Sequence, residues 1–194
     1  MRSMDLRELD RHTLLVLDKL VAAVTPADLT RPTPCSGWTL ADLLRHQVSE
    51  NHAFATAARE GSAPDWDAGV LGDDPYAAYR ASVDDFLAAF AGDAVLERQL
   101  TINHFGTFPG SIAAHMHLVD TVAHGWDLAR ALGLPYEPDA EAVYIATKLA
   151  ERIPDEGREK NGSFAHSVAV PADASALDRF LALLGRDPAW TAVS

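Results

Sequence analysis

Apolar residues recur at helical spacing through most of the chain, in stretches separated by proline, glycine and short polar segments. This periodicity predicts helices over residues 4–24, 39–60, 75–92, 109–132, 138–152 and 174–184. Several of these stretches also begin or end with residues that commonly cap helices. Thr39 followed by Asp42 resembles a capping box, Asp74 precedes Pro75, and Gly133 follows the longest stretch. The chain is therefore predicted to be predominantly helical.

Only two short segments suggest β-structure, one near Thr101 and one near Val168, and the polar stretch 155–163 reads as a mobile loop. Long helices joined by loops predict an all-α fold, namely a four-helix bundle with additional short C-terminal helices and at most a minor strand pair. We expect residues 1–155 to form the bundle. Residues 156–194 are expected to pack on it as an extension, not as an independent domain.

Composition narrows the class of protein. The 194 residues are 48% hydrophobic and 23% charged, which is typical of a soluble globular domain. The net charge of −12 disfavours binding to nucleic acid or to anionic lipid. Neither a long apolar run nor a signal-like N-terminus is present, and a single cysteine, Cys35, excludes an intrachain disulfide. We expect a cytoplasmic protein, monomeric or homodimeric, with no nucleic-acid or membrane partner.

Polar residues interrupt the apolar face of the predicted helix 109–132. At about 100° per residue, Asp120 lies about 60° from His117 around the helix axis, and His124 lies about 20° from His117. These three side chains share one stripe, whereas His115 points about 160° away. Imidazoles and a carboxylate on a buried face need partners, because burying them unpaired costs several kcal/mol.

A divalent metal ion is one such partner. Carboxylate and imidazole groups at positions i and i+4 can converge on one ion, and helical bundles build metal sites from facing helices. A third ligand would come from the predicted helix 39–60, where His46 and His52 lie on different faces and periodicity does not choose between them. Two readings without a metal stay open: a hydrogen-bonded Asp120–His124 pair, or a buried polar network of His117, Asp120 and His124.

Three segments occur together in a familiar order. They are Thr-Pro-Cys-Ser-Gly-Trp at 33–38, Asp-Leu-Leu-Arg-His at 42–46, and Asp-Thr-Val-Ala-His-Gly-Trp-Asp-Leu-Ala at 120–129. With them the chain resembles the DinB-like superfamily over about residues 5–150. It is most similar to actinobacterial proteins related to the N-terminal domain of mycothiol-dependent maleylpyruvate isomerase. The resemblance implies a bundle of the DinB-like type.

The resemblance also implies a site. Members of the superfamily bind a divalent metal through a histidine of the second helix and a carboxylate-or-histidine-x-x-x-histidine pair of a later helix. The matching residues here are His46, Asp120 and His124. The isomerase relatives carry glutamate at the position of Asp120, and the thiol-transferase relatives carry histidine. Aspartate is one methylene shorter than glutamate, so direct coordination by Asp120 stays open, with His117 as the substitute ligand. Zinc is the expected metal, and nickel and iron are the alternatives.

Three nitrogen and oxygen ligands leave a coordination position open, as in catalytic metal sites. Together with the resemblance, this predicts a transferase or isomerase that depends on mycothiol or another low-molecular-weight thiol, in which the metal activates a thiolate toward an electrophilic small molecule. The alternative is a non-catalytic metal-binding or stress-associated helical bundle that acts as a dimer.

Three residues of the matched segments complete the expectations. Asp127 lies at the edge of the stripe, where it can orient a ligand imidazole, although a solvent-exposed helix charge is an equal alternative. Trp126 lies opposite the stripe and is expected to pack between helices. No basic residue neighbours Cys35 in the sequence, so it is expected to be structural.

Overall fold

The computed structural model describes residues 5–156, 158 and 163–192. The elements follow one another as α1 (Leu6–Ala22), the 3-10 helix η1 (Pro26–Thr30), α2 (Leu40–Glu60), α3 (Pro75–Ala89), α4 (Ala94–Glu97), β1 (Gln99–Ile102), β2 (Gly106–Pro109), α5 (Gly110–Leu132), α6 (Ala140–Ala150) and α7 (Ala176–Leu183). The predicted all-α class is confirmed. The short elements η1 and α4 were not expected from the periodicity.

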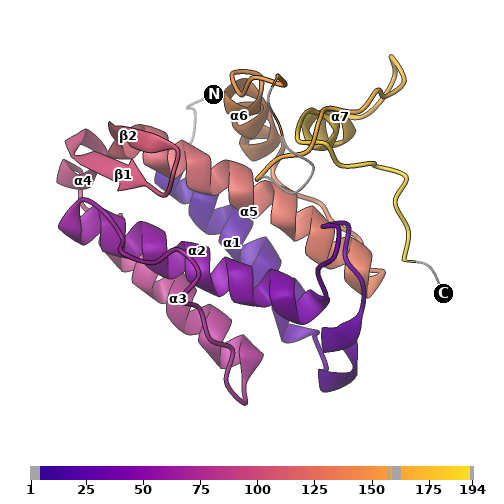
Figure 1. Cartoon of the computed structure of the whole chain (residues 1–194), viewed down its shortest axis with the longest axis horizontal. Coiled ribbons are helices and arrows are strands. Elements are labelled where there is room, and N and C mark those ends of the chain that lie inside the picture. The colour runs from indigo at the N-terminus through magenta and orange to yellow at the C-terminus, as the bar shows by residue number, and fades with distance from the viewer. Residues whose placement is uncertain (1–4, 157, 159–162, 193–194) are drawn as a thin grey trace.

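Helices α1, α2, α3 and α5 form the bundle, in which α2 packs beside α3 and α1 beside α5 (Figure 1). Their inward faces share one hydrophobic core, to which Leu17, Leu43, Tyr79, Phe86 and Leu128 contribute fully or almost fully buried side chains. Burial of apolar surface of this kind is the main favourable contribution to folding. The core fixes α2 and α5 face to face.

The helix ends follow the local chemistry of the sequence. At the start of α2, Asp42 Oδ2 accepts a hydrogen bond from the Thr39 backbone N–H at 2.9 Å, and Thr39 Oγ1 accepts one from the Asp42 backbone N–H at 3.3 Å. At the end of α5, Gly133 adopts a left-handed φ of 69°, which a residue with a Cβ rarely does. These two ends set the lengths of the helices that carry the candidate ligands.

The predicted strand near Thr101 forms, but its partner is not the segment near Val168. β1 pairs antiparallel with β2 in the register Gln99↔Pro109. Asn103 in the connecting turn and Gly106 at the start of β2 have positive φ values of 43° and 119°. The expectation of a strand at Val168 was wrong: its backbone N–H donates to the Ala182 carbonyl at 3.0 Å, outside any strand. Pairing with an adjacent segment closes a much shorter loop and therefore costs less entropy.

Helices α6 and α7 cover the side of α5 that faces away from the bundle core (Figure 1). A second hydrophobic cluster joins them, with Leu118 and Trp126 of α5, Ala142 of α6, and Phe180 and Leu181 of α7 among its buried members. The cluster supports the proposal that the C-terminal part is an extension of the bundle. The predicted mobile loop 155–163 falls in part outside the described residues, at 157 and 159–162.

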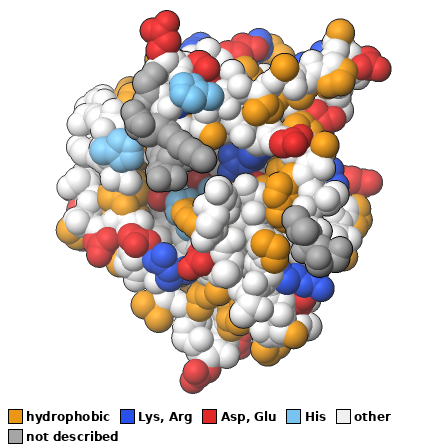
Figure 2. All heavy atoms as spheres, turned by 45° about the vertical axis from the view of Figure 1, so that its right-hand side comes forward, with side chains coloured by type: hydrophobic (Ala, Val, Ile, Leu, Met, Phe, Trp, Pro, Cys, Tyr) orange, Lys and Arg blue, Asp and Glu red, His pale blue; other side chains and the backbone are white. Residues whose placement is uncertain are grey.

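Within the described part of the chain, no helix combines the length and apolarity needed to cross a bilayer. On the face drawn in Figure 2, acidic side chains are scattered between smaller basic patches, and no extended basic surface is present. This distribution agrees with the net charge of −12.

Candidate metal centre

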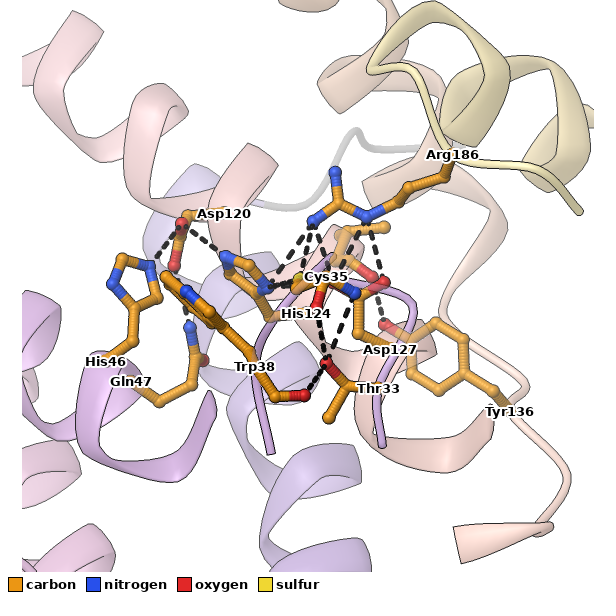
Figure 3. A network of polar contacts seen from close by, with 11 residues as sticks. Thr33, Cys35, Trp38, His46, Gln47, Asp120, His124, Asp127, Tyr136 and Arg186 are labelled. Carbon is orange, nitrogen blue, oxygen red and sulfur yellow. Dashed lines mark hydrogen bonds and ion pairs between the residues drawn. The ribbon is translucent and has the colours of Figure 1, made fainter. Parts of the chain in front are cut away.

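Helices α2 and α5 bring His46, Asp120 and His124 together at one point (Figure 3). Asp120 Oδ1 lies 3.5 Å from His46 Nε2 and 3.3 Å from His124 Nε2. One ligand atom from each residue falls within 4.8 Å of the other two. The shorter side chain of aspartate therefore still reaches both imidazoles.

These separations fit a divalent metal better than direct hydrogen bonds. A good N–H···O bond spans about 2.7–3.2 Å, and both distances exceed that range. Ligands held about 2.0–2.1 Å from a tetrahedral ion are separated by about 3.4 Å, which follows from the geometry of a tetrahedron. The distances from Asp120 Oδ1 to His124 Nε2 and to His46 Nε2, 3.3 and 3.5 Å, agree with this ligand-to-ligand separation. The set of two imidazole nitrogens and one carboxylate oxygen also matches zinc, nickel or iron.

The charges at this point stabilise one another. Burial by itself would raise the pKa of Asp120, but the His124 and His46 imidazoles outweigh it and hold that pKa well below its ordinary value. Burial would likewise lower the pKa of His124, and the Asp120 carboxylate outweighs it and raises that pKa well above the ordinary value. Without a metal, a proton on His124 supplies the positive charge that Asp120 requires.

Two neighbours orient the candidate ligands. Gln47 Nε2 donates to Asp120 Oδ2 at 2.9 Å, which leaves Oδ1 facing the imidazoles. Asp127 Oδ2 lies 2.9 Å from His124 Nδ1, so the carboxylate accepts the Nδ1 proton and Nε2 faces Asp120. The predicted contact between Asp127 and an imidazole is present, and Asp127 is fully buried. The Trp38 ring lies beside both imidazoles, with its centroid 5.0 Å from that of His46 and 6.3 Å from that of His124 (Figure 3).

A second group of potential ligands, Cys35, His124 and Asp127, adjoins the first and already contains a cation. Arg186 Nε donates to Asp127 Oδ1 at 2.9 Å and Arg186 Nη2 to Asp127 Oδ2 at 2.7 Å, while Nη2 lies 3.9 Å from Cys35 Sγ. The Cys35 thiol donates to Asp127 Oδ2 at 3.2 Å. Because the guanidinium occupies this position, the second group is not a metal site in this conformation.

His117 does not lie at the candidate centre. Its Nδ1 is 2.7 Å from Asp10 Oδ2, its Nε2 is 2.9 Å from Asn51 Oδ1, and the Phe86 ring stacks on it at 3.6 Å. The prediction of His117 as a substitute ligand was therefore wrong. The alternative of a polar network that joins His117 to Asp120 was also wrong. The angle around the helix axis placed His117 on the same stripe as His124. However, the two residues are seven positions, or two helical turns, apart, which separates them by about 10 Å along the axis of α5.

The structure also chooses between the two histidines of α2. His52 Nδ1 contacts Asp85 Oδ2 of α3 at 2.7 Å, and its side chain is 45% exposed. The two histidines lie on different sides of α2, and only the side that carries His46 faces Asp120 on α5. Trp126 packs as expected, because it is 3% exposed and belongs to the cluster shared with α6 and α7.

Comparison with known proteins identifies the family. The family model described as "Mycothiol maleylpyruvate isomerase N-terminal domain" matches residues 12–129, which is more than half of the chain. The chain belongs to this family. The matched range contains His46, Asp120, His124 and Asp127 but ends before Arg186.

Relatives of this family member include two uncharacterized proteins of Mycobacterium tuberculosis, from strains CDC 1551 / Oshkosh and ATCC 25618 / H37Rv. Each is 29% identical over 168 residues, which cover 86% of this chain and 90% of the relative. The crystal structure of the mycothiol-dependent maleylpyruvate isomerase superposes with a TM-score of 0.64 at 15% identity. That of a histidine-to-alanine mutant of the isomerase gives a TM-score of 0.62 at 14% identity. Each superposition covers 77% of this chain and 72% of the other, and shows the shared fold.

Sequence patterns in this family member assigned no role to three polar neighbours of the candidate centre. Gln47 follows His46 directly, but no local rule points it at Asp120. Arg186 lies 59 residues after Asp127, and only tertiary packing brings the two together. Glu50 follows His46 by one helical turn, so periodicity places it on the same side of α2 as His46, but periodicity alone gave it no role. Burial, reinforced by the negative charge of Asp120, raises the pKa of the Glu50 carboxyl to about 8.

Proposed function

We propose that this family member is a metal-dependent enzyme that uses mycothiol or another low-molecular-weight thiol as co-substrate in a transfer or isomerisation reaction. The observation that carries the proposal is the convergence of His46, Asp120 and His124. Asp120 Oδ1 lies 3.3 Å from His124 Nε2 and 3.5 Å from His46 Nε2. The proposed ligands are His46 Nε2, Asp120 Oδ1 and His124 Nε2. The expected ion is Zn²⁺, with Ni²⁺ and Fe²⁺ as alternatives.

Membership of the family and the donor set support this reading. Two imidazoles and one carboxylate leave a position for an exogenous ligand, which is the arrangement of catalytic sites. A zinc-type ion bound here favours thiolate over thiol at neutral pH and so supplies a nucleophile. The solved structure that shares this fold is a mycothiol-dependent maleylpyruvate isomerase, which makes a thiol the first co-substrate to test.

The residues of the centre remain accessible to a small molecule. The side chains of His46 and Asp120 are each 23% exposed, and that of His124 is 10% exposed. This partial exposure favours exchange of ligands over a closed structural site. A cavity of about 450 Å³ lies elsewhere, between α1 and α3, and is lined by Asp10, Phe86 and Phe90 among others. It does not include the proposed ligands, so we assign substrate binding to the exposed side of the centre.

The chain's own groups have defined tasks in this proposal. Gln47 and Asp127 hold the carboxylate and the imidazole in place through their 2.9 Å contacts. The Trp38 ring forms a wall beside both imidazoles and excludes water from that side. The carboxyl of Glu50, with a pKa of about 8, retains its proton at neutral pH and provides an acid one helical turn from His46.

Metal content and turnover test the proposal separately. Purified protein without a chelating tag is loaded with Zn²⁺, dialysed and assayed for metal, then incubated with mycothiol and a bimane electrophile. We expect about one ion per chain and a rate of thiol conjugation above that of the metal-free protein. His124→Ala should abolish both. His115→Ala is the matched control, because His115 lies on the same helix, outside the group of candidate ligands, and its Nδ1 contacts the Ser111 carbonyl at 2.7 Å.

Each result has a definite meaning. A metal content well below one per chain after refilling would overturn the assignment of His46, Asp120 and His124 as ligands. Stoichiometric metal without thiol-dependent turnover across a panel of electrophiles would support the alternative, a non-catalytic metal-binding bundle. Equal loss in His124→Ala and His115→Ala would show that the effect comes from disturbing α5 and not from the site.

A further inference from the structure

We propose that Arg186, in the C-terminal segment, is a positioning residue of the metal centre that acts on His124 through Asp127. The inference rests on the proposed function, because it assumes that His124 is a ligand. It goes beyond the family match, which ends at residue 129. The centre would therefore be completed by a segment that follows the bundle in the sequence.

The contacts form a continuous chain from the C-terminal segment to the candidate ligand. Arg186 Nε donates to Asp127 Oδ1 at 2.9 Å, and Nη2 donates to Oδ2 at 2.7 Å (Figure 3). This is the bidentate geometry in which arginine fixes both the position and the plane of a carboxylate. The same Oδ2 accepts the proton of His124 Nδ1 at 2.9 Å. A shift of the guanidinium would therefore rotate or displace the carboxylate that holds the imidazole.

Burial makes this dependence strong. Asp127 is 0% exposed and the Arg186 side chain is 12% exposed, so water can replace little of what the guanidinium provides. Removing one member of a buried ion pair leaves an uncompensated charge, which is far more disruptive than losing a surface pair. Without Arg186, the carboxylate has to obtain its compensation from His124 or move toward water. Either change alters the orientation of Nε2.

Arg186 also fills the position next to Cys35 and His124 Nδ1, from which it lies 3.9 and 3.4 Å away. The shorter 2.9 Å contact of Nδ1 with Asp127 identifies the carboxylate, not the guanidinium, as the partner of this nitrogen. By occupying this position, the guanidinium keeps a second cation away from the Cys35, His124 and Asp127 group. Arg186 thus leaves Nε2 as the nitrogen that faces Asp120 and His46.

A matched pair of variants separates positioning from simple anchoring of the C-terminal segment. Arg130 Nη2 donates to the Pro188 carbonyl at 3.1 Å, which anchors the same segment without touching Asp127. We expect Arg186→Ala to weaken zinc binding about 10- to 100-fold, the range typical when the partner of a ligand is removed. Arg130→Ala should leave zinc affinity within about twofold of the unmodified protein, because the chain from Asp127 to His124 stays intact. Arg186→Lys keeps the positive charge but cannot make the bidentate contact with the Asp127 carboxylate, so the zinc affinity of this variant should fall between those of the other two.

Affinity is measured by competition with a chromophoric chelator. A second readout is the visible absorption of the Co²⁺-substituted protein, which reports coordination geometry directly. Arg186→Ala should change the band positions, whereas Arg130→Ala should not. If Arg186→Ala does not fold, as judged by circular dichroism and thermal melting, Arg186→Lys and Arg186→Gln provide the test.

The outcomes distinguish this inference from the proposed function. If the unmodified protein binds no zinc, the proposed function fails and the inference fails with it. If the unmodified protein binds zinc and the folded Arg186 variants bind it equally well with an unchanged Co²⁺ spectrum, only the inference is overturned. Equal losses in Arg186→Ala and Arg130→Ala would also overturn it, because they would show that docking of the segment alone is responsible.

Discussion

Gln47 Nε2 donates a hydrogen bond to Asp120 Oδ2 at 2.9 Å, linking the residue after His46 on α2 to a candidate ligand on α5. Gln47 is 4% exposed, so its amide has little access to water and is held by this contact. Adjacent residues of α2 thus contribute one candidate ligand and the partner of another. The separation between α2 and α5 therefore controls both the position of His46 and the orientation of Asp120.

This relationship predicts that Gln47→Leu weakens zinc binding about tenfold, because Asp120 loses the donor that fixes its plane while the side-chain volume is nearly kept. Zinc affinity from chelator competition measures the effect, with circular dichroism to confirm the fold. Leu43→Met, a conservative change at a fully buried position of the same helix, serves as the control. Equal zinc affinity in Gln47→Leu and the unmodified protein would show that the 2.9 Å contact has no role in binding.

The placement of His117 predicts a variant that affects stability but not metal. His117→Ala should lower the free energy of unfolding by about 3–5 kcal/mol, because it leaves the buried carboxylate of Asp10 without its partner. Zinc stoichiometry should be unchanged, since His117 contacts Asp10 and Asn51 and lies outside the group of candidate ligands. Denaturant melts and metal analysis of the folded fraction test both parts. A loss of zinc equal to that in His124→Ala would restore His117 as a candidate ligand.

The raised pKa of His124 predicts that zinc affinity depends on pH. In the metal-free protein this pKa lies well above its ordinary value, since the Asp120 carboxylate outweighs the effect of burial. Zinc must then displace a proton from Nε2, so apparent affinity should rise about tenfold per pH unit below that pKa. Calorimetry in two buffers of different ionisation enthalpy should detect about one proton released per zinc bound. Affinity that is constant between pH 6 and pH 8 would contradict the expectation.

The pKa of about 8 at Glu50 predicts how stability of the metal-free protein varies with pH. The folded state holds this proton more tightly than the unfolded chain, whose reference pKa is 4.5. The contribution of Glu50 is therefore fully present below about pH 4.5 and is lost as the pH rises through about 8. Glu50→Gln should be more stable than the unmodified protein at pH 8.5, by on the order of 2 kcal/mol, and nearly equal to it at pH 5.

Urea denaturation at the two pH values measures this difference. Glu60→Gln, a change at an exposed position of the same helix, should behave like the unmodified protein at both. If Glu50→Gln has the same stability as the unmodified protein at pH 8.5, the Glu50 carboxyl is not destabilised by burial.

Local chemistry in the sequence determined the helices and one half of the candidate centre. The Thr39 and Asp42 capping box forms as predicted, and Gly133 ends α5 in the left-handed conformation. The i, i+4 spacing of Asp120 and His124 is a property of any α-helix, so their proximity followed from the sequence. Each of these features depends on residues within one or two turns of one another.

Tertiary structure decided the rest. Only the packing of α2 against α5 selects His46 over His52, and only the axial distance along α5 separates His117 from His124. The contact of Arg186 with Asp127 joins segments 59 residues apart. Periodicity describes the angle of a side chain around its own helix, whereas these contacts depend on the height of each residue along its helix and on which helices are neighbours. Those quantities are set by the burial of the hydrophobic core as a whole.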